Sequence, residues 1–228
     1  MKKNILIICA LGLLWLGSLL HAKSQKYDVL VYGATPAGVC AAVATAREGS
    51  SVALVSPYDY VGGLMSGGLS LSDSNQCARQ LMGGLFVEIH QRIYEHYEDA
   101  GVKLNYKIDL TKNDKWTYEP HVAEKVFHDM IKEVDVTVHL EHQLVGVTKE
   151  STRIKTIKTR KGVFLAGQFI DATYEGDLYA AAGAGFRLGR ESRDEHDEPH
   201  AGVVYFDYEN QRFLSGTTGA GDDRLPAY

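Results

Sequence analysis

The stretch from Tyr27 to Pro57, YDVLVYGATPAGVCAAVATAREGSSVALVSP, decides the fold. Its apolar run Val29–Tyr32 predicts a buried parallel strand. A helix of mostly small residues is expected from Pro36, followed by a second strand over Ser51–Val55. A strand, a glycine turn, a helix and a second strand are the opening of a dinucleotide-binding domain. We therefore expect an α/β fold with a Rossmann-like domain and a nucleotide site at the turn.

The turn keeps two of the three glycines of the G-x-G-x-x-G pattern. Gly33 permits the tight turn, and Gly38 lets the helix pack against the strand. Thr35 replaces the middle glycine, so either the phosphates stay farther from the backbone or the Thr35 hydroxyl donates to them. Ser56 stands where an acid usually accepts from a ribose hydroxyl, which weakens an NAD interpretation. A structural βαβ unit without a ligand is the alternative.

The rest of the chain predicts two more helices and a strand-rich middle segment. The glycine-rich stretch 56–84 predicts a long functional loop. Apolar residues at helical spacing predict one helix from Leu85 to a stop at Gly101 and another from about Pro120. Strands are expected at 134–140, 144–149, 154–159 and 163–170, the last two joined as a hairpin. Residues 169–189 predict a buried strand, a glycine turn and a small-residue helix.

The first 22 residues predict a secretory signal peptide. Lys2 and Lys3 precede the apolar run Ile5–Leu20, and Ala22 is a small residue suited to cleavage. The run is shorter than the roughly 20 residues that span a bilayer, so a membrane anchor is the weaker alternative. We expect an exported protein, periplasmic or extracellular, with no stable membrane anchor after cleavage.

Charge and cysteines exclude other classes of function. The net charge is -5 and no basic run occurs, so we expect no nucleic acid as partner. Without a C-x-x-C motif, cysteine-based metal or dithiol chemistry has no support, and we predict no metal site. Cys40 fits a buried thiol in the first helix, while a Cys40–Cys77 disulfide stays open. The scattered histidines single out no catalytic acid or base.

Five segments in this order resemble the N-terminal part of bacterial exported FAD-dependent oxidoreductases. They are DVLVYGATPAG (28–38), VGGLMSGGLS (61–70), MGGLFVEIHQRIYEHY (82–97), YEPHVAEKVFHDMI (118–131) and FIDATYEGDLYAAAGAGFRLGRES (169–192). The turn of this family commonly reads G-x-T-P-A-G, so the resemblance makes Thr35 a family choice. It implies a flavoprotein fold of the two-dinucleotide-domain type, FAD as cofactor, and hydride transfer between an organic substrate and the flavin.

The resemblance also implies which positions hold the cofactor. Gly33, Thr35, Pro36, Ala37 and Gly38 would cradle the pyrophosphate, and Gly62, Gly63 and Leu64 would pass near the phosphates and ribitol. Leu144 and Val145 would meet the adenine through their backbone. The chain would return to the cofactor at Ala172, Thr173, Glu175, Gly176 and Asp177. Ser56 falls where the family usually has Glu, so its ribose contact is in doubt.

Family members continue well past the final residues DDRLPAY. The resemblance therefore implies that residues 23–228 form an incomplete FAD-binding oxidoreductase domain that lacks its C-terminal portion. Such a fold should expose apolar surface. A truncated, non-catalytic remnant and an NAD(P)-binding dehydrogenase are the alternatives. A secreted scaffold or carbohydrate-binding module lacks an aromatic platform to support it.

Overall fold

The computed structural model describes residues 25–69, 77–188, 195, 197, 206–207 and 209–213. Contacts between Cα atoms divide the chain into two units, Met1–Gly183 and Ala184–Tyr228. The predicted signal peptide lies outside the described residues, as does part of the long glycine-rich loop. Within the described part, no helix combines the length and apolar character needed to cross a membrane.

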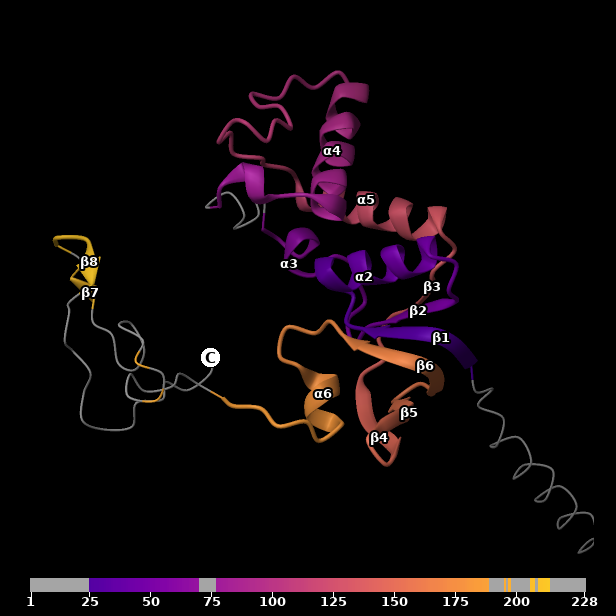
Figure 1. Cartoon of the computed structure of the whole chain (residues 1–228). Helices are drawn as coiled ribbons and strands as arrows, with labels where there is room; N and C mark the ends of the chain where they lie inside the picture. Colours follow the sequence, from indigo (N-terminus) through magenta and orange to yellow (C-terminus); the bar gives the residue numbers. More distant parts are fainter. Residues whose placement is uncertain are drawn as a thin grey trace, which may run out of the picture. The chain divides into compact units, whose positions relative to one another are not determined.

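A six-stranded mixed sheet forms the centre of the first unit, in the order β3-β2-β1-β6-β5-β4 (Figure 1). Its strands are β1 (Gln25–Tyr32), β2 (Val52–Val55), β3 (Thr137–His139), β4 (Leu144–Glu150), β5 (Arg153–Thr159) and β6 (Val163–Asp171). The first four in spatial order are parallel, and β6, β5 and β4 continue as an antiparallel meander. The carboxyl ends of β1, β2 and β6 therefore meet at one edge of the sheet, where α/β proteins bind ligands.

Helices cover both faces of this sheet. They are α2 (Pro36–Arg47), α3 (Gly63–Ser66), the 3₁₀ helix η3 (Arg79–Leu81), α4 (Gly84–Asp99), α5 (Pro120–Glu133) and α6 (Asp177–Ala181). Helices α2 and α5 lie on one face and the short α6 on the other (Figure 1). In the second unit, β7 (Phe206–Asp207) pairs with β8 (Arg212–Phe213).

The apolar core divides in the same way, because successive residues of a strand point to opposite faces. Val31 of β1 and Leu54 of β2 pack with α2, α4 and α5. Leu30 and Tyr32, their neighbours on the opposite face, pack with Ile157 of the meander and with α6. The last three residues of β1, Leu30, Val31 and Tyr32, are buried on both faces of the sheet, as its apolar run predicts.

An ion-pair network joins three helices of the larger core. Glu88 of α4 accepts from Arg47 of α2 at 2.6 Å and from Arg92 at 3.0 Å. Arg92 also donates to Glu133 of α5 at 2.8 Å. The hydrogen bond from Arg47, followed by that from Arg92, lowers the pKa of Glu88 to about 2.

Most predicted elements are confirmed. Helix α5 starts at Pro120 and buries the predicted apolar face; the predicted hairpin is formed by β5 and β6. Strand β3 is shorter than expected from 134–140, because Asp135 adopts a left-handed φ of 56°. The stretch 56–84 contains α3 and η3 and is therefore not entirely loop. Cys40 and Cys77 are both free thiols, and partial burial raises the pKa of Cys40.

Candidate nucleotide-binding site

The turn between β1 and α2 is held together by the Thr35 side chain. Thr35 Oγ1 accepts from the Gly38 N–H at 3.1 Å and thereby caps α2. The same hydroxyl donates to the carbonyl of Ala172, just past β6, at 2.7 Å. Its single proton is used inside the protein, so while this bond holds the hydroxyl has no proton to give to a phosphate. Thr35 thus connects two turns that follow neighbouring strands.

Glycine is needed at two positions of this turn because backbone lies where a side chain would start. Gly33 has a φ of +107°, and a Cβ there would lie 2.7 Å from the carbonyl of Ala172. A Cβ on Gly38 would lie 1.9 Å from the Gly33 oxygen. The predicted roles of the two glycines in the turn and in helix packing therefore agree with the geometry.

The start of α2 leaves a free backbone donor. Pro36 has no N–H, and the Gly38 N–H is bonded to Thr35. No described residue accepts a hydrogen bond from the Ala37 N–H, and Ala37 is an exposed residue. The first turn of α2 carries no acidic residue, so no side chain of the helix itself compensates the positive end of its dipole. Such a helix start favours an anionic group.

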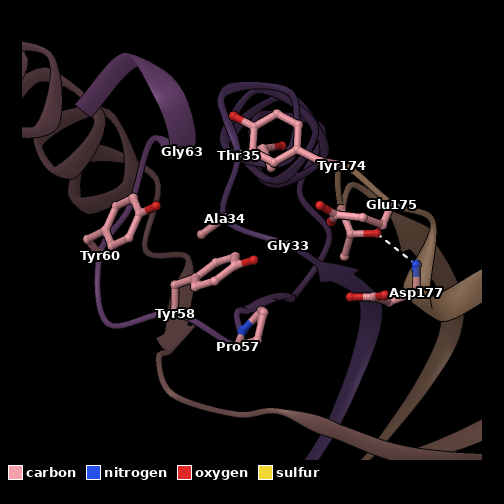
Figure 2. A pocket seen from close by; sticks show the side chains of 11 residues that line it. Gly33, Ala34, Thr35, Pro57, Tyr58, Tyr60, Gly63, Tyr174, Glu175 and Asp177 are labelled. Carbon is pink, nitrogen blue, oxygen red and sulfur yellow. Dashed lines mark hydrogen bonds between the residues drawn. The ribbon is translucent and has the colours of Figure 1, made fainter. Parts of the chain in front are cut away.

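A pocket that we call the turn pocket opens beside this helix start. It encloses about 340 Å³ of space, partly open to solvent, and is lined by Gly33, Ala34, Thr35, Pro57, Tyr58, Tyr60, Gly63, Thr173, Tyr174, Glu175 and Asp177. Figure 2 shows Tyr58 and Tyr60 on one side and Tyr174, Glu175 and Asp177 on the other.

The loop with the second glycine pair closes one end of the turn pocket. The Gly62 N–H donates to the Ala34 carbonyl at 2.7 Å, so this loop is fixed to the first turn. The Leu64 N–H donates to the Tyr174 hydroxyl at 2.8 Å. A Cβ on Gly63 would lie 2.2 Å from that hydroxyl oxygen. Residues 62–64 therefore lie beside the turn that precedes α2, and their contact with phosphates and ribitol stays a prediction.

A second hollow, the β4 pocket, adjoins the turn pocket. It is lined by Tyr32, Pro57, Tyr58, Gln143, Leu144, Val145, Asp177 and Ala181 and holds about 920 Å³, much of it open to solvent. Three residues, Pro57, Tyr58 and Asp177, line both hollows. The two hollows are therefore adjacent at the carboxyl edge of the sheet, and we call them together the depression.

Tyr32 fixes the start of β4 beside this depression. Its hydroxyl donates to the His142 carbonyl at 3.2 Å and accepts from the Leu144 N–H at 2.8 Å. Burial raises the pKa of Tyr32 to about 12. The hydroxyl stays protonated at neutral pH, so the connection between β1 and β4 persists.

Ser56 lies apart from both pockets. Its side chain is fully buried, and its Oγ accepts from the Tyr58 N–H at 3.2 Å. Its backbone bonds to His139 and His142 fix it between β3 and β4. In this structure Ser56 offers no accessible atom to a ribose, and Tyr58 is the next residue along the chain that presents a polar group to the pockets.

The structure brings most of the predicted site residues together. Gly33, Thr35, Gly63, Thr173, Glu175 and Asp177 line the turn pocket, and Leu144 and Val145 line the β4 pocket. Pro36, Ala37, Gly38, Gly62, Leu64, Ala172 and Gly176 belong to the same turns without lining either pocket. Which of these residues contact a cofactor stays a prediction.

Sequence reasoning missed the tyrosines of the depression. Tyr58 and Tyr60 directly follow β2, and Tyr174 follows β6. An aromatic residue just past the carboxyl end of a central parallel strand could have signalled them, because that edge of the sheet faces ligands. Burial, and secondarily the Glu175 carboxylate, raises the pKa of Tyr58, which keeps its hydroxyl protonated. No cluster of potential metal ligands occurs among the described side chains.

Comparison with known proteins identifies this arrangement. The family model described as FAD dependent oxidoreductase matches residues 28–228, nearly the whole chain. No curated protein matches the chain by sequence.

Solved structures show the same fold. L-Proline dehydrogenase from P. horikoshii is 18% identical with a TM-score of 0.52, and the match covers 74% of this chain and 59% of that one. The Diels-Alderase PyrE3 of pyrroindomycin biosynthesis is 13% identical with a TM-score of 0.50, and the match covers 74% of this chain and 37% of that one. The matched region thus amounts to less than two thirds of either protein.

Proposed function

The chain belongs to the FAD dependent oxidoreductase family, and we propose that it binds FAD along the depression and positions it for hydride exchange with a small organic substrate. The observation that carries this proposal is the start of α2, whose Ala37 N–H has no acceptor among the described residues, beside a pocket lined by Gly33 and Gly63. Family membership identifies the cofactor, and the geometry of the helix start supports the proposed position.

The residues fit the diphosphate bridge of this cofactor. The Ala37 N–H has no protein acceptor among the described residues and faces no carboxylate from its own helix. Glycines at positions 33 and 63 keep side chains out of the turn pocket walls. The helix dipole adds attraction for a doubly charged group. These residues would hold the pyrophosphate.

The neighbouring β4 pocket fits the adenosine half. Leu144 and Val145 present strand backbone to it, and Val145 is 57% exposed. The Leu144 N–H is already bonded to the Tyr32 hydroxyl, so Val145 is the residue whose backbone would meet the edge of a purine. When bound, the flavin supplies the hydride chemistry, while the chain orients the cofactor and the substrate.

Titration of the full chain tests the proposal directly. We expect FAD to bind and to raise the temperature of unfolding, since a ligand that binds only the native state stabilises it. NAD and NADP in parallel titrations should give no such shift. Stabilisation by NAD or NADP alone would support a nicotinamide-dependent dehydrogenase, and no response to any of the three would support a remnant without cofactor.

We also infer that the chain is exported. The support is the positive end and apolar run of residues 1–22, which is typical of a cleaved leader. Mass spectrometry of the protein recovered from a bacterial periplasm should give a mature N-terminus at Lys23. An intact Met1 on protein confined to the cytoplasm would contradict export.

A further inference from the structure

Ser56 leaves a question about how the adenosine ribose is recognised. In dinucleotide-binding folds an acid at the end of the second strand accepts from the ribose. Here that position is Ser56, which is fully buried and whose Oγ is bonded to the Tyr58 N–H. A ribose in the depression must therefore find its acceptor elsewhere.

Asp177 stands at the border of the two pockets. The turn pocket has two acidic residues in its lining, Glu175 and Asp177, and the β4 pocket has Asp177 alone. Both side chains are exposed. Figure 2 shows the Asp177 carboxylate pointing into the turn pocket, toward the side on which the Tyr58 hydroxyl also points inward. Tyr58 and Asp177 thus both lie where the two pockets adjoin.

The chemical order of the cofactor matches the order of the pockets. In FAD, the adenosine ribose joins the pyrophosphate to the adenine. With the pyrophosphate at the start of α2 and the adenine at β4, the ribose lies where the pockets meet. We propose that the Asp177 carboxylate accepts hydrogen bonds from the 2′- and 3′-hydroxyls of this ribose and so replaces the acid expected at position 56. This assignment rests on the proposed binding of FAD.

The backbone around Asp177 is fixed in a way that suits this role. The Asp177 N–H donates to Thr173 Oγ1 at 2.9 Å, and Thr173 Oγ1 donates to the Asp171 carboxylate at 2.7 Å. Asp171 also accepts from the Tyr179 N–H at 2.8 Å. The carboxylate of Asp177 therefore projects from an anchored turn.

The charge of the pyrophosphate distinguishes an Asp177 that bonds to the ribose from one that only lies near the cofactor. A carboxylate near a doubly charged pyrophosphate repels it, so an acid with no hydroxyl to accept weakens cofactor binding. An acid that accepts from a ribose diol gains hydrogen bonds to a charged group, which are stronger than neutral ones. Removal of Asp177 consequently weakens binding only if it bonds to the ribose.

The test compares two ligands on the full-length wild-type chain and three variants of it. FAD and an FAD analogue with 2′,3′-dideoxyadenosine are titrated by flavin fluorescence against wild type, Asp177→Ala, Asp177→Asn and Glu175→Ala. The Glu175 variant is the matched control, because it removes a pocket carboxylate that lines only the turn pocket. Thermal unfolding without ligand checks that each variant is folded.

The expected result is selective. Asp177→Ala should weaken FAD binding by about 10- to 100-fold, the effect of losing hydrogen bonds to a charged group. It should change the Kd of the dideoxy analogue less than about threefold. Glu175→Ala should leave the preference for FAD over the analogue unchanged. Asp177→Asn should retain part of the preference, since its amide oxygen still accepts.

Two kinds of outcome would overturn the assignment. If wild type binds FAD and Asp177→Ala binds it equally well or more tightly, the carboxylate is not a ribose acceptor, while the proposed function stands. Equal weakening for both ligands would also exclude the ribose contact. If wild type binds neither ligand, the proposed function fails, and the ribose assignment fails with it.

Discussion

Replacing Gly38 with Ala tests whether the close contact between α2 and the β1 turn builds the site. The added Cβ would lie 1.9 Å from the Gly33 oxygen and 3.1 Å from the Ala172 Cβ. Because contacts below 3.0 Å are essentially never seen, the helix start must move by about 1.1 Å. Backbone is the obstacle, so no side-chain rotation relieves the contact.

The cost can be worked out from the bonds this movement strains. Overpacking of a tight contact costs about 1–3 kcal/mol. Weakening the Thr35 cap on the Gly38 N–H adds about 1 kcal/mol. Alanine regains about 1 kcal/mol of helix propensity. The net loss is about 1–3 kcal/mol, and each kcal/mol lowers the unfolding temperature by about 2–4 °C in a chain of this size.

The assay is calorimetric unfolding together with FAD titration of Gly38→Ala. We expect a lower unfolding temperature and at least tenfold weaker FAD binding, since the free Ala37 N–H moves with the helix start. Gly162→Ala is the control, because nothing lies within 4 Å of a Cβ there and its φ is not positive. If Gly38→Ala unfolded and bound FAD like this control, the tight turn would not be what shapes the site.

Three further changes test neighbouring features. Thr35→Val removes both bonds of the hydroxyl and should cost about 1–2 kcal/mol in urea unfolding, whereas Thr35→Ser should cost less; equal stability of the two variants would contradict the capping role. Gly63→Ala places a side chain at φ +51° and against the Tyr174 hydroxyl, and it should lower the free energy of unfolding by about 1–2 kcal/mol. Adding Tyr174→Ala should relieve only the contact, so full recovery of stability in the double variant would refute backbone strain. The folded-state pKa of Glu88 is depressed to about 2, so its ion pairs stabilise the protein above the ordinary pKa of 4.5, and this contribution is lost as pH falls toward 2. Chemical unfolding from pH 6 to pH 3 should show a steeper loss of stability for wild type than for Glu88→Gln. Parallel curves would show that the ion pairs of Glu88 do not stabilise the fold.

Most of the fold could be predicted from local patterns in the sequence. The apolar run ending at Tyr32, Pro36 at the helix start and the spacing of the buried face of α5 each depend on residues close in sequence. Such signals predict an element without knowledge of its neighbours. That the 33–38 turn and the 62–64 loop belong to one site was implied by the resemblance to a family and not by local spacing.

Long-range contacts account for what the sequence did not reveal. The Thr35 proton goes to Ala172, and the burial of Ser56 depends on His139 and His142 as well as on Tyr58. The spacing of residues along the chain predicts neither the Thr35–Ala172 bond nor the burial of Ser56. The position of Asp177 between two pockets requires β4, β6 and the end of β2 to be placed together.

The bond between Thr35 and Ala172 spans 137 residues. During synthesis, the first strand and helix emerge long before the segment that completes their turn. Because distant partners must meet before they stabilise one another, this connection forms late in folding. A nascent chain that stops short of Ala172 therefore has the glycine turn but lacks the bond that fixes this turn to the segment after β6.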